Sequence, residues 1–570
     1  MIRRAADIAL AVSSHEGRKE ISRWPSEANT TGLRPRVESA PAGAAELSRV
    51  PAPLPGRIRS GALSGGFHSL RSLEHRLISF VLSGRAAGAL LFLALLLHAV
   101  ALRAEPLVVG FDRFHAKQPS SEGGRLLFNE LGCANCHGVE TGLPARRGPD
   151  LNGVTQRVSA EWLRKFLANP SAAHEGTAMP HLLSHGESEA VLNYLGTLKP
   201  AALAKAKPSK HVNAARGCEL FHTLGCVACH APAKDFSPAD GTPKAADFTH
   251  RSVAFPNLAE KHVLLSLTEF IRDPLKLRAD GRMPCIAMDE QDAVDIAGWL
   301  LNFEGSDGTI APRIPPFTAD KALAERGRGI VASRRCAACH DLPKDVAAKP
   351  VPLRHADGGC LSEKITGASV EMPRYDLSAQ QRKVLSLFVK KRDESATSQQ
   401  LATLTLESLN CLACHDRDGR GGPDAARKAY FLGDHNLGDT GRYSPPLTGV
   451  GRKLQPDWLA KVLTGEFRVR PYLQTKMPMY GAATATLGAL LAKADAKKEA
   501  PLPGGDDTAG RKLIGTLGGL GCITCHRWGE QASLGIQGLD LSNLGQRIQP
   551  GWLREYVVNP AAYRAGTLMP

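Results

Sequence analysis

Aromatic residues are scarce in this 570-residue chain, at 5% of the composition, whereas glycine and proline are abundant, with 56 and 38 copies. Such a composition favours several small domains with long loops over one large hydrophobic core. From the length we expect roughly three to five units. The sequence also lacks a recognisable constellation for general acid–base or nucleophilic catalysis. These absences argue against a single large catalytic domain.

Basic residues are not gathered into a nucleic-acid-binding pattern. The formal net charge is +15, but +7 of it lies in residues 1–104. A nucleic-acid-binding protein would carry Lys and Arg clustered on one face together with a matching motif. The sequence has neither, so we expect no nucleic-acid partner.

Long apolar runs are also rare, and the most prominent lies within "RAAGALLFLALLLHAVALRAEP". Arg85 precedes this run, and Ala99-Val100-Ala101 follows it as a cleavage site, which is the layout of a secretory signal peptide. The run is short for a membrane span, so an uncleaved tether through residues 86–102 is the alternative. We therefore interpret residues 81–104 as a signal peptide or membrane anchor and expect a periplasmic or other extracytoplasmic location.

Residues 1–80 show no sustained helical or strand period and are rich in Arg, Ser, Pro and Gly. They contain one Lys, Lys19, and no Met after Met1. Because a signal peptide belongs at the N-terminus, we interpret this segment either as disordered or as translated from a start codon assigned too far upstream.

Cysteine spacing is the most informative feature, because ten of the 13 Cys fall into five copies of Cys-x-x-Cys-His. The copies are Cys133-Cys136-His137, Cys226-Cys229-His230, Cys336-Cys339-His340, Cys411-Cys414-His415 and Cys522-Cys525-His526. This is the attachment signature of c-type haem, in which two thiols form thioether bonds and the His is the proximal iron ligand. Zinc knuckles are the alternative, but zinc does not require a His after every second Cys. We expect five covalently attached haem c groups.

Methionine is rare, with eight copies, yet five of them are followed by proline. One Met-Pro pair comes 42, 53, 32, 62 and 43 residues after each successive His, at Met179, Met283, Met372, Met477 and Met569. A thioether suits haem iron and raises its reduction potential, and proline restricts the loop. We expect each Met to be the sixth ligand for the motif before it. The alternative ligands in their units are His355, His181 and His435.

Each unit resembles a class I c-type cytochrome domain. The resemblance rests on a helix pattern before the motif, as in "GRLLFNELGCANCH", and a closing helix pattern after Met-Pro, as in "ESEAVLNYLGTL". It implies close crossing of these helices at small residues, including Gly124, Gly217 and Gly510. It also implies that a loop proline gives its carbonyl to the proximal His, at Pro149, Pro256, Pro352 and Pro446. The fifth unit has "GLDLSNL", without proline, at this place.

The resemblance implies an all-α fold, a tandem array of five small cytochrome c-like domains with long loops. The expected boundaries are 118–203, 210–306, 318–395, 400–500 and 505–570. A helix with an aligned tryptophan follows the motif in three units, at Trp162, Trp458 and Trp552. The fifth unit lacks a closing helix, so we expect the gene to continue beyond Pro570.

Three Cys lie outside the motifs. Cys218 and Cys285 belong to the second unit, where a disulfide and two free thiols are both open interpretations. Cys360 has no assigned role.

We expect a secreted five-haem cytochrome that carries electrons between extracytoplasmic redox partners and is not itself an enzyme. Two alternatives remain open. One is the haem-bearing arm of a larger oxidoreductase whose catalytic domain lies beyond residue 570. The other is a multihaem peroxidase with one open haem, for which the third unit is the first candidate.

Overall fold

The computed structural model describes residues 105–199, 211–238, 248, 250–302, 314–353, 356–363, 372–470, 472–498, 501–502, 504–535, 538–564 and 567–570. All of these residues belong to one compact unit. The segments 1–80 and 81–104, including the proposed tether 86–102, lie outside the described residues. Within the described part of the chain, no helix has the length and hydropathy needed to cross a membrane.

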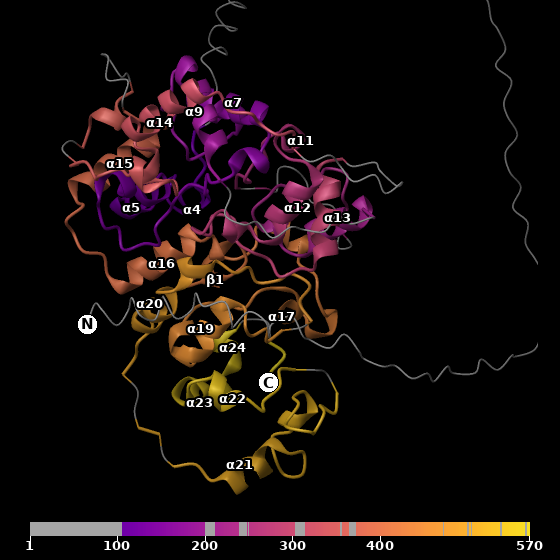
Figure 1. Ribbon diagram of the computed structural model, residues 1–570. Coiled ribbons are helices and arrows are strands. Elements are labelled where there is room, and N and C mark those ends of the chain that lie inside the picture. The colour runs from indigo at the N-terminus through magenta and orange to yellow at the C-terminus, as the bar shows by residue number, and fades with distance from the viewer. Residues whose placement is uncertain are drawn as a thin grey trace, which may run out of the picture. The chain divides into compact units, whose positions relative to one another are not determined.

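Helices and loops make up nearly all of the described chain, in agreement with the helical fold class expected from the sequence (Figure 1). The two described strands are short. They are β1 (Asp416–Arg417) and β2 (Arg420–Gly421), which pair antiparallel with Asp416 opposite Gly421. The architecture therefore depends on how the helices pack.

A first helix precedes every Cys-x-x-Cys-His motif, and four closing helices follow Met-Pro pairs. The first helices are α5 (Ser121–Glu130), α10 (Ala214–Thr223), α14 (Lys321–Ser333), α16 (Ser398–Ser408) and α21 (Asp507–Ile514). The closing helices are α9 (His185–Thr197), α13 (Glu290–Leu300), α15 (Ala379–Lys390) and α20 (Leu487–Ala494). Each first helix begins at a side chain that accepts an N–H bond from its first turn, at Ser120, Asn213, Asp320, Thr397 and Asp506.

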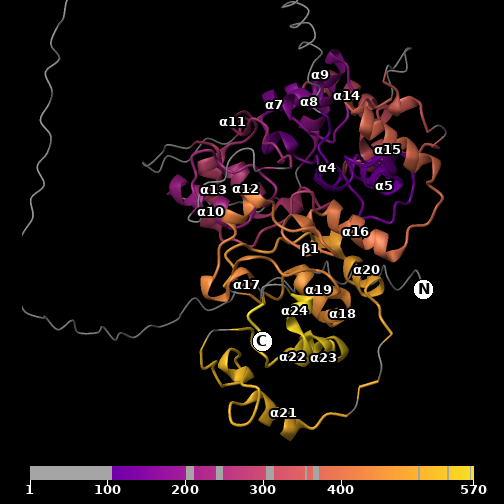
Figure 2. The same cartoon turned by 180° about the vertical axis from the view of Figure 1, so that it is seen from behind.

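The helix pairs do not all follow the order of the sequence. Helix α10 packs against α13, and α16 packs against α20, each within its own stretch of chain. Helix α5 instead packs against α15, and α14 packs against α9, as both views show (Figures 1 and 2). The boundaries 118–203 and 318–395, expected for two self-contained domains, are therefore wrong, because each of these domains is built from halves of both stretches.

Glycine at the crossing point allows the helices to approach closely in either arrangement. A Cβ on Gly124 would lie 2.1 Å from the carbonyl oxygen of Val384, and one on Gly327 would lie 2.0 Å from that of Ala190. Gly217 makes the same kind of contact inside the continuous second domain. Any larger residue would force the paired backbones apart.

We name the surroundings of each motif after its histidine. The His137 lobe comprises 119–147 and 350–391, and the His340 lobe comprises 148–199 and 314–349. The His230 lobe comprises 211–302, the His415 lobe 398–498 and the His526 lobe 504–570.

We call the His137 and His340 lobes the exchanged lobes, because each takes its closing helix from the other's stretch of chain. Each has a hydrophobic core made from both of its sequence segments. In the His340 lobe, buried Trp162 and Leu192 belong to the same cluster as Val331. In the His137 lobe, Leu126 clusters with Phe388, and both are fully buried. Since burial of apolar side chains is the main favourable term in folding, these mixed cores stabilise the exchange.

The remaining helices are connecting or supporting elements. They are α4 (Val109–Phe114), α6 (Cys133–His137), α7 (Ala160–Ala168), α8 (Pro170–Ala173), α11 (Leu258–Lys261), α12 (Leu264–Arg272), α17 (Asp439–Arg442), α18 (Val450–Lys453), α19 (Pro456–Thr464), α22 (Leu544–Arg547), α23 (Pro550–Val558) and α24 (Pro560–Tyr563). Single 3₁₀ turns are η1 (Val154–Gln156), η2 (Cys226–Ala228), η4 (Pro274–Lys276), η5 (Cys336–Ala338), η6 (Lys344–Val346), η7 (Gly359–Leu361), η8 (Cys411–Ala413), η9 (Ala425–Tyr430), η10 (His435–Leu437), η11 (Gly481–Thr484) and η12 (Cys522–Thr524).

The aligned tryptophans lie on helices α7, α19 and α23. Trp162 stacks on Phe166 with 4.8 Å between ring centroids, and Trp552 stacks on Tyr556 at 4.7 Å. A lysine ammonium from the neighbouring lobe lies over each of these two indoles: Lys261 at 4.6 Å from Trp162 and Lys453 at 4.5 Å from Trp552. The lysines thus join separate lobes through cation–π contacts.

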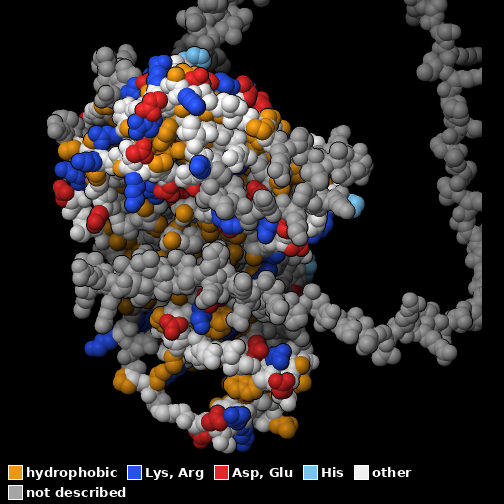
Figure 3. Space-filling model, viewed as in Figure 1, with side chains coloured by type: hydrophobic (Ala, Val, Ile, Leu, Met, Phe, Trp, Pro, Cys, Tyr) orange, Lys and Arg blue, Asp and Glu red, His pale blue; other side chains and the backbone are white. Residues whose placement is uncertain are grey.

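The His526 lobe is the least buried of the described lobes. Helix α21 has no buried residue, and Gly510 has no neighbour within 4 Å of an added Cβ. Leu517 and Leu520 are 90% and 79% exposed. Figure 3 shows hydrophobic side chains at the surface in this region, whereas charged side chains of both signs are interspersed over the opposite end of the same face. The helix crossing implied at Gly510 is not formed by the described residues.

Candidate functional site: the Cys-x-x-Cys-His turns

Each motif forms one tight turn directly after its first helix. In four motifs the His N–H bonds to the carbonyl oxygen of the first Cys at 2.9–3.0 Å, and the fifth, Cys133–His137, is the short helix α6. The residue before the first Cys has a positive φ in every copy: Gly132, Gly225, Arg335, Asn410 and Gly521. This left-handed residue separates the motif from the helix, so the turn brings two thiols and an imidazole together.

All five motif imidazoles are held by one ring nitrogen. Nδ1 hydrogen-bonds to a backbone carbonyl oxygen in each case, from His137 to Val351 at 3.2 Å, His230 to Val253 at 3.0 Å, His340 to Pro149 at 2.8 Å, His415 to Pro445 at 2.6 Å and His526 to Leu539 at 2.6 Å. A carbonyl only accepts, so Nδ1 must carry the proton. Nε2 then keeps its lone pair for a metal.

The carbonyl partners correct the assignment that the cytochrome resemblance implied. Pro149 serves His340 in place of His137, because its loop belongs to the exchanged half. Pro256, Pro352 and Pro446 are not the acceptors, and the neighbouring Val253, Val351 and Pro445 take this role. The fifth motif does without proline, since the Leu539 carbonyl is equally able to accept.

The pKa of Cys339 is lowered to about 6 by a hydrogen bond with Cys136, but burial favours the uncharged form of most other motif side chains whose pKa is shifted. Burial lowers the pKa of His230, His340 and His415, although the carbonyl bond acts in the opposite direction. Burial also raises the pKa of Cys226 and Cys411 to about 12. Zinc binds thiolates, so buried protonated thiols disfavour a zinc knuckle. Among the described residues, no group of three or more His, Cys, Asp and Glu is arranged to hold a metal ion by itself.

In the His137 and His340 lobes, the methionine lies with a motif that does not directly precede it in the sequence. Met179 packs against the same core as Cys336, and its N–H bonds to the Thr177 hydroxyl at 3.3 Å. Met372 lies beside Gly359, next to Leu361, which packs on the core that holds Cys133. We expected each Met-Pro pair to serve the motif before it, whereas these contacts place Met179 and Met372 with the other motif.

The other three methionines stay within the stretch of chain that carries their motif. Met283 precedes closing helix α13, and Met477 precedes α20. Met477 is 46% exposed. Met569 repeats the hydrogen bond of Met179, because its N–H bonds to the Thr567 hydroxyl at 3.2 Å.

Of the three alternative histidine ligands, the structure describes His181 and His435. The Nδ1 of His181 accepts a hydrogen bond from Arg374 at 2.8 Å, which engages the ring. His435 begins turn η10. His355 lies outside the described residues.

The remaining cysteines are free thiols in the structure. The Cys218 sulfur lies 3.8 Å from Nδ1 of His222, and the Cys285 thiol donates to the Arg272 carbonyl at 3.5 Å. The disulfide considered for this pair is therefore not formed. Cys360 lies on η7 and is close enough to Cys133 to affect its pKa.

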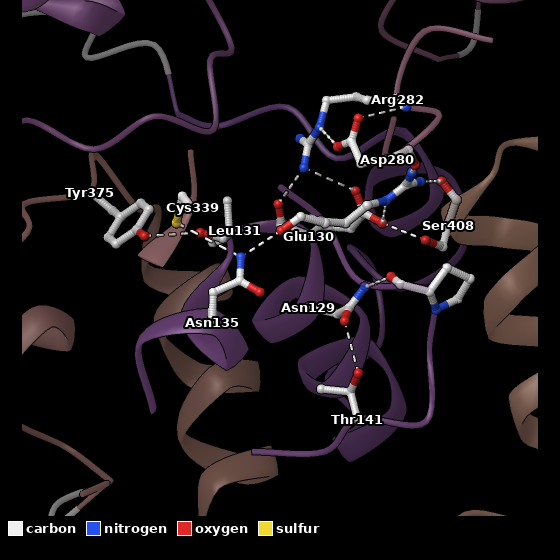
Figure 4. Close-up of polar contacts among 12 residues, drawn as sticks. Asn129, Glu130, Leu131, Asn135, Thr141, Asp280, Arg282, Cys339, Tyr375 and Ser408 are labelled. Carbon is white, nitrogen blue, oxygen red and sulfur yellow. Dashed lines mark hydrogen bonds and ion pairs between the residues drawn. The ribbon is translucent and has the colours of Figure 1, made fainter. Parts of the chain in front are cut away.

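A buried polar cluster joins three lobes, and it was not foreseen from the sequence (Figure 4). Arg146 donates to the Glu130 carboxylate at 2.8 Å, to the Asp280 carbonyl at 2.5 Å and to the Ser408 carbonyl at 2.5 Å. Arg282 donates to the Glu130 carbonyl at 2.7 Å. Burial acts to lower the pKa of Arg146, but the Glu130 carboxylate outweighs it and the pKa is raised. Because three of these four bonds join residues 134 to 262 positions apart, no local pattern marks the cluster.

Comparison with known proteins supports a c-type cytochrome family. Residues 121–199 and 214–304 each match the family model described as cytochrome c. No curated protein and no solved structure matches the chain. Cytochrome c domains imply covalently bound haem c and haem-based electron transfer.

The residues of the motifs fit such a group. Two thiols on one turn would form the thioether links, and an imidazole with a free Nε2 would ligate the iron. Haem iron, when bound, supplies one-electron oxidation and reduction. The two thiols would attach it, and the carbonyl-bonded imidazole would orient it.

Proposed function

We propose that the chain is a five-haem c-type cytochrome that passes electrons between redox partners outside the cytoplasm. The observation that carries this proposal is the set of five Nδ1–carbonyl hydrogen bonds, one at every Cys-x-x-Cys-His turn. Three of these motifs lie outside the two family matches. They repeat the same local geometry, which supports extending the assignment to all five.

The axial ligands in this proposal are His and Met, with an exchange between two lobes. His340 pairs with Met179, because Met179 shares its core with Cys336. His137 pairs with Met372. His230 pairs with Met283, His415 with Met477 and His526 with Met569, each from its own stretch. A thioether opposite imidazole favours a raised reduction potential, which suits an electron carrier.

Extracytoplasmic location is supported by the signal-like segment 81–104 and by the haem-attachment motifs themselves. In this proposal the partners are redox proteins. The interspersed charges on the surface in Figure 3 fit transient docking better than a polyanion site.

The test is expression of the chain in a host that attaches haem c, followed by intact-mass measurement and a haem assay. We expect five haems per chain, a new N-terminus close to residue 104 and reversible reduction of all five. Each Cys pair changed to Ala should remove one haem. A mature chain with fewer than five haems, or with zinc in their place, would refute the proposal.

A further inference from the structure

Four of the five motifs meet in two pairs. In the first pair, Asn135 Nδ2 lies 3.8 Å from the Cys339 sulfur, and the Cys136 and Cys339 thiols are within hydrogen-bonding reach. In the second pair, Asn410 Nδ2 lies 3.1 Å from the Cys229 sulfur. The haem-attachment atoms of two different lobes are therefore neighbours in both pairs.

The Met-Pro segments join the same lobes. His181 and Arg374 form two backbone hydrogen bonds, of 2.9 and 3.0 Å. Cys285 and Met479 form the same antiparallel bridge at 2.9 and 2.8 Å. Each of these four residues directly follows a Met-Pro pair. Two independent contacts thus repeat in both pairs, one at the attachment turns and one at the methionine loops.

A tyrosine follows the bridge in each pair. Tyr375 comes directly after Arg374, and its hydroxyl donates to the Leu131 carbonyl at 2.9 Å, two residues before Cys133. Figure 4 shows this bond with Cys339 beside it. Tyr375 packs on the same core as Cys133. Burial and then the nearby Cys133, Cys339 and Cys136 raise the pKa of its hydroxyl.

Tyr480 occupies the corresponding place in the second pair. It comes directly after Met479 and is 7% exposed. Burial raises its pKa, and the cysteines that add to this effect are Cys411, Cys229 and Cys414. These cysteines again belong to two motifs.

We propose that the motifs of His137 and His340 form one coupled redox pair and those of His230 and His415 form another, with Tyr375 and Tyr480 as positioning residues. This inference rests on the proposed function, because it requires a haem at each motif. Charges in a protein interior interact more strongly the closer they are, so the charge state at one motif shifts the reduction potential at its neighbour. In the described residues, no hydrogen bond joins the His526 motif to another motif, and Cys525 is exposed.

The test is a double-deletion cycle followed by spectroscopic redox titration. C133A/C136A removes the haem at His137, C336A/C339A removes the one at His340, and a fourth protein lacks both. We add the titration curves of the unchanged protein and of the protein that lacks both haems, and subtract the curves of the two proteins that lack one haem. If the two sites are independent, this combination is zero at every potential. We expect a clear residual for this pair and for the His230/His415 pair. Cycles that combine either site with C522A/C525A should leave none and serve as the control.

Haem content separates the two possible failures. Haem counts of five, four, four and three confirm that every motif is loaded, and a zero residual at those counts overturns the pairing alone. Other counts would overturn the proposed function first. Equal residuals for all combinations of sites would also overturn the pairing, since coupling would then be general.

Tyrosine variants test the positioning role without removing a haem. Tyr375→Ala in the four cycle proteins should shrink the residual of the His137/His340 pair, and Tyr375→Phe should shift the curve while leaving the haem count unchanged. Tyr430→Phe, at a buried tyrosine, is the matched control and should leave the curve in place. An unchanged residual in Tyr375→Ala would refute the positioning role.

Discussion

The His230 and His340 lobes bury equivalent helix pairs in different ways. The His230 lobe uses α10 and α13 from one continuous stretch, whereas the His340 lobe combines α14 with α9, which precedes it by more than 100 residues. At both crossings a glycine lies where a Cβ would be 2.0 Å from a carbonyl oxygen of the partner helix. The glycine–carbonyl contact is therefore the same whether the second helix comes from the same stretch of chain or from a distant one. Loop-closure entropy grows slowly with loop length, by about 0.6 kcal/mol for each doubling, so the longer connection carries little penalty.

The exchanged lobes also differ from the His230 lobe in what ties them to the rest. Arg146 and Glu130 belong to the His137 lobe. Arg146 donates to backbone carbonyls of the His230 and His415 lobes, and the Glu130 carbonyl accepts from Arg282 of the His230 lobe. The exchange is thus embedded in a larger assembly. Substitutions in this cluster and at the glycines where the helices cross can distinguish two models. In one, the exchanged lobes are tied to the other lobes, and in the other the chain is a row of independent domains.

Loss of Arg146 should have the largest effect. Its side chain is 2% exposed, and Arg146→Met leaves the Glu130 carboxylate buried with a weakened set of partners. We expect a loss of about 3–5 kcal/mol in the free energy of unfolding of the haem-loaded protein. Denaturant titration measures this loss. Arg164→Met, which removes an ion pair with the partly exposed Glu189, is the control and should cost less than about 1 kcal/mol. Equal losses in both variants would contradict the joining role of Arg146.

Filling the space where α14 and α9 cross should have the next largest effect on stability. Gly327→Val places carbon atoms against the Ala190 carbonyl, and we expect destabilisation of about 1–3 kcal/mol. The same substitution at Gly329, on the same helix with nothing within 4 Å, is the matched control. Thermal unfolding compares the two. The disturbed haem should be the one that loses Met179, and a stable Gly327→Val protein would show that the two helices do not cross.

A third pair of changes locates the His340 loop, with a smaller effect. Pro149→Ala keeps the carbonyl that accepts from His340, so we expect only about 0.4–1 kcal/mol of destabilisation from the more flexible chain. Gly148→Ala should do more, because its Cβ would lie 2.3 Å from Cε1 of His340. Both changes should shift the spectrum of the haem at His340. A shift confined to the haem at His137 would instead support an arrangement in which each lobe is built from one continuous stretch of chain.

The sequence reveals the features that are local in the chain. The Cys-x-x-Cys-His turns, the helix before each motif and the closing helices at 185–197, 290–300 and 379–390 follow from spacing and apolar pattern over a few residues. The partner of each turn is not local. The family match at 121–199 runs without a break across Gly148, although the structure assigns its two sides to different lobes.

Gly327 shows where a signal was present but incomplete. It occupies the same place on α14 that Gly124 occupies on α5, so the sequence contains the crossing point. The sequence does not reveal which helix crosses at this glycine. The atom that the glycine contacts is a backbone carbonyl oxygen, and every residue has one. The same limit explains why Pro149 was assigned to His137 although its carbonyl accepts from His340.

The most direct test of the exchange is a crossed ligand experiment. The haem at His137 is removed with C133A/C136A, and Met179→Ala or Met372→Ala is then added. Electron paramagnetic resonance counts the high-spin ferric haems among the four that remain, with Met283→Ala as the positive control. The exchange predicts that Met179→Ala converts one haem to high spin and that Met372→Ala converts none, with the reverse result in C336A/C339A. Conversion by Met372→Ala, but not by Met179→Ala, in the protein that lacks the His137 haem would contradict the exchange.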